Sequence, residues 1–201
     1  MRNLSSRPRR PGVVAAVASA AVLVLAACGG GGGGSSSSSG SSESAAAPAN
    51  APAGALKIGV LTTCGGPFAT FEAESLSGAK YALIKDAGGK AEGQKPQDQV
   101  TGAKAGGTPL AVSYGCSDAT PDKAVAEARR LVENVGVNIL LGPLSGDEGV
   151  AVANYAKSHP DVTFVNGTSG AQSTTLSVQA PNFFRFGGDG AQWMAGVGTY
   201  A

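Results

Sequence analysis

Few residues of this 201-residue chain could carry out covalent chemistry. The single histidine, His159, comes just before Pro160 at the end of a predicted helix, away from the loops where α/β sheets bind ligands. Residues 167–171 read Gly-Thr-Ser-Gly-Ala, which approaches the Gly-x-Ser-x-Gly turn of hydrolases but ends in alanine. No helical pattern follows it directly, and no Gly-x-Gly-x-x-Gly phosphate loop follows the first predicted strand. We therefore expect no catalytic residue, cofactor or metal site, and an α/β hydrolase is the alternative.

The N-terminus has the pattern of an export signal followed by a lipid-attachment site. Arginines up to Arg10 precede an apolar stretch, residues 13–27, which is shorter than the ~20 residues needed to span a bilayer. Leu-Ala-Ala-Cys at 25–28 is similar to the bacterial lipobox, whose cysteine is acylated with diacylglycerol and becomes the first mature residue. We expect a signal peptide at 1–27 and a lipid anchor on Cys28. The alternative is an ordinary signal in which the cysteine has no role.

A low-complexity segment separates the signal from the rest of the chain. From Cys28 to residue 55 the sequence is almost entirely Gly, Ser, Ala and Pro, with a lone Glu43. It has no apolar periodicity with which to offset the entropy lost on ordering. We expect a flexible tether, with an r.m.s. reach of roughly 30 Å, between the membrane and a folded domain that starts near Leu56.

The charge of the chain argues against a nucleic-acid partner. The formal net charge is +1, but four of the 15 cationic residues lie in the signal: Arg2, Arg7, Arg9 and Arg10. Without them, 11 Lys and Arg face 14 Asp and Glu, a net charge of −3. Proteins that bind nucleic acid carry the opposite charge, so none is expected here.

From residue 56 onward, short apolar runs alternate with amphipathic segments. The predicted strands are 56–61, 110–114, 137–141, 162–165 and 182–186. The predicted helices are 75–87, a helix with N-cap Thr120 that extends to Val135, and a helix that ends at Ser158. This alternation predicts an α/β fold, a doubly wound parallel sheet in a three-layer sandwich with strand order 2-1-3-4-5. The loops after the strands then converge at the carboxyl edge of the sheet.

Two cysteines remain after Cys28, and both follow predicted strands. Cys64 lies just past the first strand and Cys116 just past the second, and these strands are neighbours in the predicted order. Adjacent strands are about 5 Å apart, which suits the Cα separation of a disulfide in an oxidising compartment. A nucleophilic Cys64 is the alternative, but the sole histidine is badly placed to serve as its base. We expect a disulfide between Cys64 and Cys116.

Several short motifs together resemble a known family. They occur in the order Leu-Lys-Ile-Gly-Val-Leu (56–61) with Gly-Pro (66–67), Ala-Gly-Gly (87–89), Asp-Lys-Ala-Val (122–125), Gly-Pro-Leu-Ser (142–145) and Asn-Phe-Phe-Arg (182–185). This series resembles the first lobe of type I periplasmic binding proteins, above all the leucine/isoleucine/valine-binding proteins of ABC importers. The resemblance implies a two-lobed clamp that holds its ligand between the lobes and whose closure is read by membrane permease subunits.

The resemblance also implies a domain organisation and a function. Lobe I would occupy 56–186 and the crossover into lobe II would begin at 187–201, with a helix over 189–201. We therefore expect a truncated chain without its second lobe. The implied function is that of an extracytoplasmic solute-binding lipoprotein of an ABC importer, which binds a branched-chain-like amino acid or a related small polar solute. A lipid-anchored ligand-sensing receptor domain of the same fold is the alternative.

Six residues are carried over from the family as ligand-binding candidates. The cleft-lining aromatic after the Gly-Pro motif corresponds to Phe71, although a core phenylalanine is an equal alternative. The groups that bind the amino acid's charged backbone correspond to Ser145, Gly146, Thr168, Ser169 and Gly170. Ser145 could instead be the N-cap of the next helix, or have both roles. The sequence departs from the family at Gly146, which stands where the ligating serine is common, so that Ser145 or the Gly146 amide must substitute; Asp147 beside it could recognise an amine. A second departure is the stretch from Ala91 to Pro109, which is longer than the usual turn of the family.

Overall fold

A six-stranded sheet forms the centre of the fold. The computed structural model describes residues 51–200, so the predicted signal peptide, Cys28 and the tether up to residue 50 lie outside the described residues. The strands are β1 (Leu56–Thr63), β4 (Lys104–Ala105), β5 (Thr108–Ser117), β6 (Ile139–Leu141), β7 (Thr163–Asn166) and β8 (Phe183–Arg185). Their order is β4-β5-β1-β6-β7-β8, and all neighbours are parallel except the β4–β5 hairpin. The predicted 2-1-3-4-5 order is therefore confirmed for the five parallel strands.

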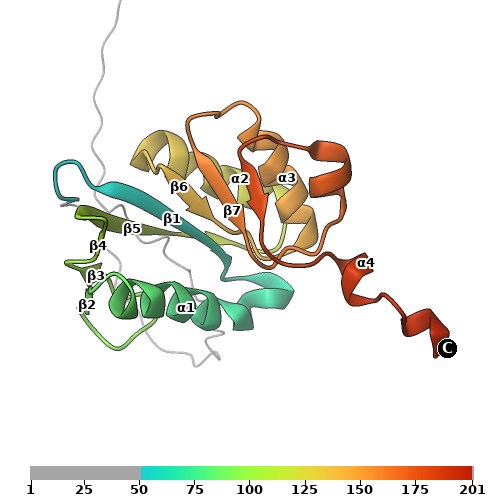
Figure 1. Ribbon diagram of the computed structural model, residues 1–201, viewed down its shortest axis with the longest axis horizontal. Coiled ribbons are helices and arrows are strands. Elements are labelled where there is room, and N and C mark those ends of the chain that lie inside the picture. The colour runs from blue at the N-terminus through green and yellow to red at the C-terminus, as the bar shows by residue number, and fades with distance from the viewer. Residues whose placement is uncertain (1–50, 201) are drawn as a thin grey trace, which may run out of the picture. The chain divides into compact units, whose positions relative to one another are not determined.

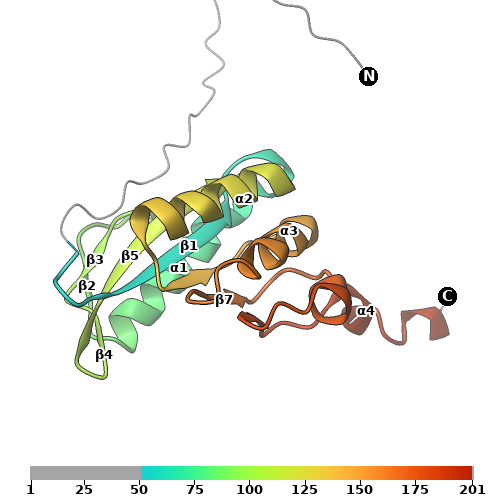
Figure 2. The same ribbon diagram turned by 90° about the horizontal axis from the view of Figure 1, so that it is seen from above.

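Helices cover the sheet from both sides, which makes three layers. Helix α1 (Glu72–Lys85) lies on one face, and α2 (Pro121–Arg129) and α3 (Gly146–Ala156) lie on the other (Figures 1 and 2). Strand β1 contributes to both cores because successive side chains point to opposite faces. Val60 packs with Leu76 on the α1 side, whereas Leu61 packs with Leu131 on the α2 and α3 side. The parallel α/β fold predicted from the apolar runs is thus the observed fold.

The segment between α1 and β5 forms a small excursion that the sequence indicated only as an unusually long connection. Its strands β2 (Lys90–Ala91) and β3 (Val100–Thr101) form an antiparallel pair of their own. The Lys80 side chain of α1 is 8% exposed, and its Nζ donates to the carbonyl oxygens of Gly93 at 2.8 Å and Lys95 at 2.7 Å. These bonds fasten the excursion to α1.

Two helix ends differ from the predictions. Thr120 occupies the N-cap position of α2, but its side chain makes no capping bond, because its hydroxyl donates to Asp118 instead. The expected helix over 189–201 is also wrong, since α4 covers only Gly190–Trp193. The backbone then turns at Gly196, whose φ of 87° belongs to the left-handed region that glycine tolerates.

The remaining helical pieces are short: η1 (Gly66–Phe71), η2 (Arg130–Val135), η3 (Thr174–Val178) and η4 (Val197–Thr199). The first and second join regular helices, since η1 leads into α1 and η2 extends α2. Between residues 51 and 200, none of the helices has the length and apolar character required to cross a bilayer.

Candidate ligand-binding site

A groove of about 590 Å³ lies where the loops after the parallel strands meet. One wall comes from η1, which follows β1, and another from the first turn of α3, which follows β6. The loop after β7 and the end of α4 complete it. The lining residues are Pro67, Phe68, Phe71, Ala119, Leu144, Ser145, Gly146, Asp147, Thr168, Gly170 and Trp193. The groove therefore lies at the carboxyl edge, where doubly wound sheets bind their ligands.

Five of the six candidates from the sequence lie along this groove: Phe71, Ser145, Gly146, Thr168 and Gly170. Phe71 is 42% exposed, so the alternative interpretation of a core phenylalanine is wrong. Its ring lies 6.3 Å from that of Phe68, measured between centroids, so both rings of η1 belong to the wall. Phe68 had no role in the sequence analysis beyond its proximity to Phe71.

Ser145 is both a groove residue and the N-cap of α3. Its Oγ accepts from the backbone N–H of Glu148 at 3.4 Å, and its own N–H donates to Glu148 Oε2 at 3.0 Å. This reciprocal pair is a capping box, and it satisfies two donors at the helix start. Glu148 is fully buried and its Oε2 also accepts from Thr63 Oγ1 at 3.3 Å, which links α3 to the end of β1. The Ser-x-x-Glu spacing at 145–148 is the sequence signal that could have identified Glu148.

Ser169 differs from the other five candidates. Its side chain is 1% exposed and does not line the groove, which contradicts the expected contact between this hydroxyl and a ligand. The reason is close packing against α3, because a Cβ at Gly149 would lie only 2.2 Å from Ser169 Oγ. Its backbone N–H donates to Asn166 Oδ1 at 2.8 Å, and Asn166 Nδ2 donates to the Pro143 carbonyl oxygen at 2.8 Å. Asn166 thereby joins the two loops that follow β6 and β7.

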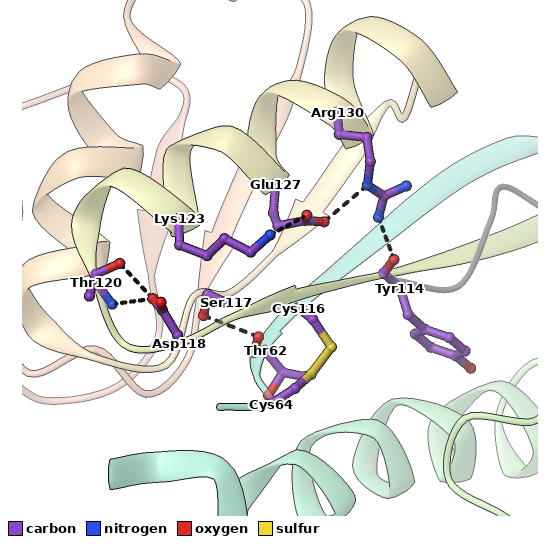
Figure 3. Close-up of polar contacts among 10 residues, drawn as sticks. All are labelled: Thr62, Cys64, Tyr114, Cys116, Ser117, Asp118, Thr120, Lys123, Glu127 and Arg130. Carbon is purple, nitrogen blue, oxygen red and sulfur yellow. Dashed lines mark hydrogen bonds and ion pairs between the residues drawn. A yellow bond between two sulfur atoms is a disulfide. The ribbon is translucent and has the colours of Figure 1, made fainter. Parts of the chain in front are cut away.

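A disulfide holds the loop after β1 to the end of β5. Cys64 and Cys116 are bonded, with their Cα atoms 5.3 Å apart (Figure 3). The Cys64 and Gly65 N–H groups donate to the Ser117 carbonyl oxygen at 2.9 and 3.2 Å. Gly66 then takes φ of 67°, and a Cβ there would lie 2.4 Å from the Asp118 carbonyl oxygen. Only glycine allows this approach, so the turn that presents η1 depends on residue type as well as on the disulfide.

Acidic and basic side chains near the groove are unevenly placed. Hydrogen bonds from the Thr120 hydroxyl and amide lower the pKa of Asp118, which comes just before groove residue Ala119 (Figure 3). Burial raises the pKa of Glu127, but the hydrogen bond and charge of Arg130, aided by Lys123, outweigh this and lower it overall. Lys123 and Arg130 therefore pair with Glu127, and neither of them lines the groove.

His159 lies at the C-terminal end of α3, as expected. Its ring stacks on Tyr155 with centroids 4.0 Å apart, and its Nε2 lies 3.6 Å from Glu133 Oε1. Burial and the hydrogen bond to Glu133 raise the pKa of Tyr155. This group belongs to the contact between η2 and α3, and none of its members lines the groove.

A parallel α/β lobe with an open groove at its carboxyl edge has the place for a small ligand that such sheets share. Residues 55–201 match the profile of the family described as periplasmic binding protein. The chain belongs to this family. No curated protein sequence matches the chain.

Solved structures of similar fold come from the same class of protein. A leucine-binding protein from Thermotoga maritima is 16% identical with a TM-score of 0.58, covering 73% of this chain and 37% of its own. A solute-binding protein of an ABC transporter from Rhodopseudomonas palustris, in complex with 3,4-dihydroxybenzoic acid, is 21% identical with a TM-score of 0.54, covering 72% and 37%. A branched-chain amino acid transporter protein from the same species is 16% identical with a TM-score of 0.55, covering 68% and 33%. The chain thus spans about a third of the length of these structures.

Proposed function

We propose that this chain is the first lobe of an extracytoplasmic, lipid-anchored solute-binding protein of an ABC importer. Its solute is an amino acid, branched-chain-like in size, or a related small polar molecule, held between this lobe and a second one. The observation that carries the proposal is the groove, whose lining combines Ser145, Gly146 and Thr168 with the aromatic side chain of Phe71. Such a combination of backbone donors, hydroxyls and one apolar wall suits a small molecule with a charged end and an apolar side chain.

The donors for the polar end come from the start of α3. The first N–H groups of a helix have no partner within the helix, and they point at whatever occupies the space before it. The capping box uses the Glu148 N–H, which leaves the amides of the groove residues Gly146 and Asp147 available to a ligand. Thr168 adds a hydroxyl from the loop after β7. The proposed role is transport and not catalysis, because Ser169 is buried and His159 lies outside the groove.

A single lobe binds such a solute weakly. The groove is open on one side, so its hydrogen bonds compete with water and contribute only ~0.5–1.5 kcal/mol each. Closure of a second lobe would remove the water and bury the usual 70–90% of the ligand surface. We therefore expect millimolar dissociation constants for this chain. Calorimetry that finds micromolar or tighter binding would contradict the two-lobe mechanism.

The test uses leucine and alanine, which share the charged end and differ in the apolar side chain. Titration monitored by Trp193 emission is expected to give saturable binding of both, with leucine bound more tightly. Phe71→Ala should remove the preference for leucine, whereas Phe186→Ala, which truncates an 80% exposed aromatic outside the groove, should leave it unchanged. Failure of both amino acids to saturate, or an equal effect of the two substitutions, would refute the proposal.

A further inference from the structure

The groove has an acidic side chain and no basic one. Asp147 is the only lining residue with an ionisable side chain. It is exposed, and within residues 51–200 its carboxylate has no ion-pair partner. The basic side chains that border the groove loops are engaged elsewhere: Lys123 lies 3.2 Å from Glu127, and Arg185 lies 3.2 Å from Asp189. No basic side chain in the lining therefore compensates the negative charge of Asp147.

Three aromatic rings also line the groove, and ring faces attract cations. Phe68, Phe71 and Trp193 are 39%, 42% and 58% exposed, so their rings are accessible to a solute. Trp193 lies against the loop after β7, since a Cβ at Gly170 would come within 2.8 Å of its Cζ3. A cationic nitrogen over such a ring gains about 0.5–1 kcal/mol at an exposed site. Three accessible rings and one free carboxylate are complementary to a positive group.

The same charges disfavour an anionic solute. The N-terminus of a helix attracts anions, but Asp147 and Glu148 both lie in the first turn of α3 and offset its positive end. Asp118, which accepts hydrogen bonds from the Thr120 amide and hydroxyl, adds a third carboxylate next to the Ala119 part of the wall. A second negative charge on the solute, beyond the one held by the backbone donors, would be repelled by the exposed Asp147 carboxylate in the lining.

We propose that the groove selects solutes with a positively charged nitrogen on the side chain, held between the Asp147 carboxylate and the aromatic rings of Phe68, Phe71 and Trp193. This inference rests on the proposed function and specifies its substrate class: a basic amino acid or a similar organic cation, in preference to a neutral or acidic analogue. The polar end of the solute still binds at the start of α3. The side-chain cation pairs with the Asp147 carboxylate, which an apolar side chain would leave without a partner.

Trp193 provides a direct readout because it is the only tryptophan in the chain. Its emission is followed during titration with lysine, norleucine and 2-aminoadipate, which share the amino acid backbone and side-chain length but differ in side-chain charge. We expect lysine to bind at least about 3-fold more tightly than norleucine, and 2-aminoadipate to bind most weakly. High salt should narrow these differences, since exposed charges are screened.

Asp147→Asn is expected to bring the lysine and norleucine affinities together. Asp161→Asn is the matched control, because it removes one exposed carboxylate outside the groove and should preserve the preference. If norleucine binds as tightly as lysine, or if Asp147→Asn leaves the ratio unchanged, the proposal is overturned while the proposed function stands. If none of the three saturates, the proposed function fails and this inference fails with it.

Discussion

Removal of the Cys64–Cys116 disulfide should cost this chain much of its stability. The two cysteines are 52 residues apart in sequence, and the bond closes this long loop in the unfolded chain. In the chain-entropy description, a loop of that length corresponds to about 4 kcal/mol at 25 °C. The folded state should change little, because β1 and β5 remain paired in parallel from Leu56 with Leu110 to Thr63 with Ser117. A loss of this size is a large part of the 5–15 kcal/mol typical of a domain.

The assay is urea unfolding followed by far-UV circular dichroism. The oxidised chain is compared with the reduced chain and with Cys64→Ala/Cys116→Ala. With a slope of about 2 kcal/mol per molar urea, the midpoint should fall by about 2 M. The reduced chain and the double variant should coincide, and reductant should not affect the variant. A midpoint shift below about 0.5 M, or two free thiols in peptide maps of the exported protein, would show the reasoning to be wrong.

Three other outcomes are expected. Gly149→Ala should destabilise the chain by about 1–3 kcal/mol, because the new Cβ would lie 2.2 Å from Ser169 Oγ, and adding Ser169→Gly should recover part of the loss; additive effects in chemical denaturation would contradict this contact. The lowered pKa of Glu127 contributes stability that is present above its unfolded pKa and is lost as pH falls through the folded value, so Glu127→Gln should flatten the acid side of a plot of melting temperature against pH; an unchanged slope would argue against the pairing with Arg130. Cys28→Ala should move the exported protein from the membrane fraction to the soluble fraction, and mass spectrometry that finds no diacylglycerol on residue 28 of the native chain would rule out lipidation.

The sheet was predictable because its strands are short apolar runs, of which the central β1 and its neighbour β5 contain continuous buried stretches. Such runs, separated by helical periodicity, leave few alternatives to a parallel α/β sheet. The order of the strands also placed the two cysteines side by side, and the structure contains the bond between them. Periodicity could not predict the excursion that contains β2 and β3, because its polar side chains and glycines show no apolar repeat. The hydrogen bonds of Lys80 hold this segment against α1 instead.

The candidate site was only partly predictable, for reasons that differ between its residues. Phe71 and Gly146 could be placed because they follow strand ends at recognisable motifs. Ser169 occupies a similar position, but its side chain turns into the packing against Gly149, which depends on a contact between distant segments. Trp193 could not be placed at all, since it reaches the groove from beyond β8 through a short helix.

The contacts beneath the groove bear on how selectivity can arise. The disulfide holds η1, the capping box holds the start of α3, and Asn166 joins the loops after β6 and β7. The disulfide is covalent, Asn166 is fully buried, and the capping box engages the hydroxyl and amide of Ser145, so these walls are held in place before a solute arrives. The ordering cost on binding is then small, and it is similar for solutes of equal size. Differences in affinity must therefore come from the side chains that remain free, which are the Asp147 carboxylate and the aromatic rings. This is why a change of one charge on the solute is the sharpest test of what the groove recognises.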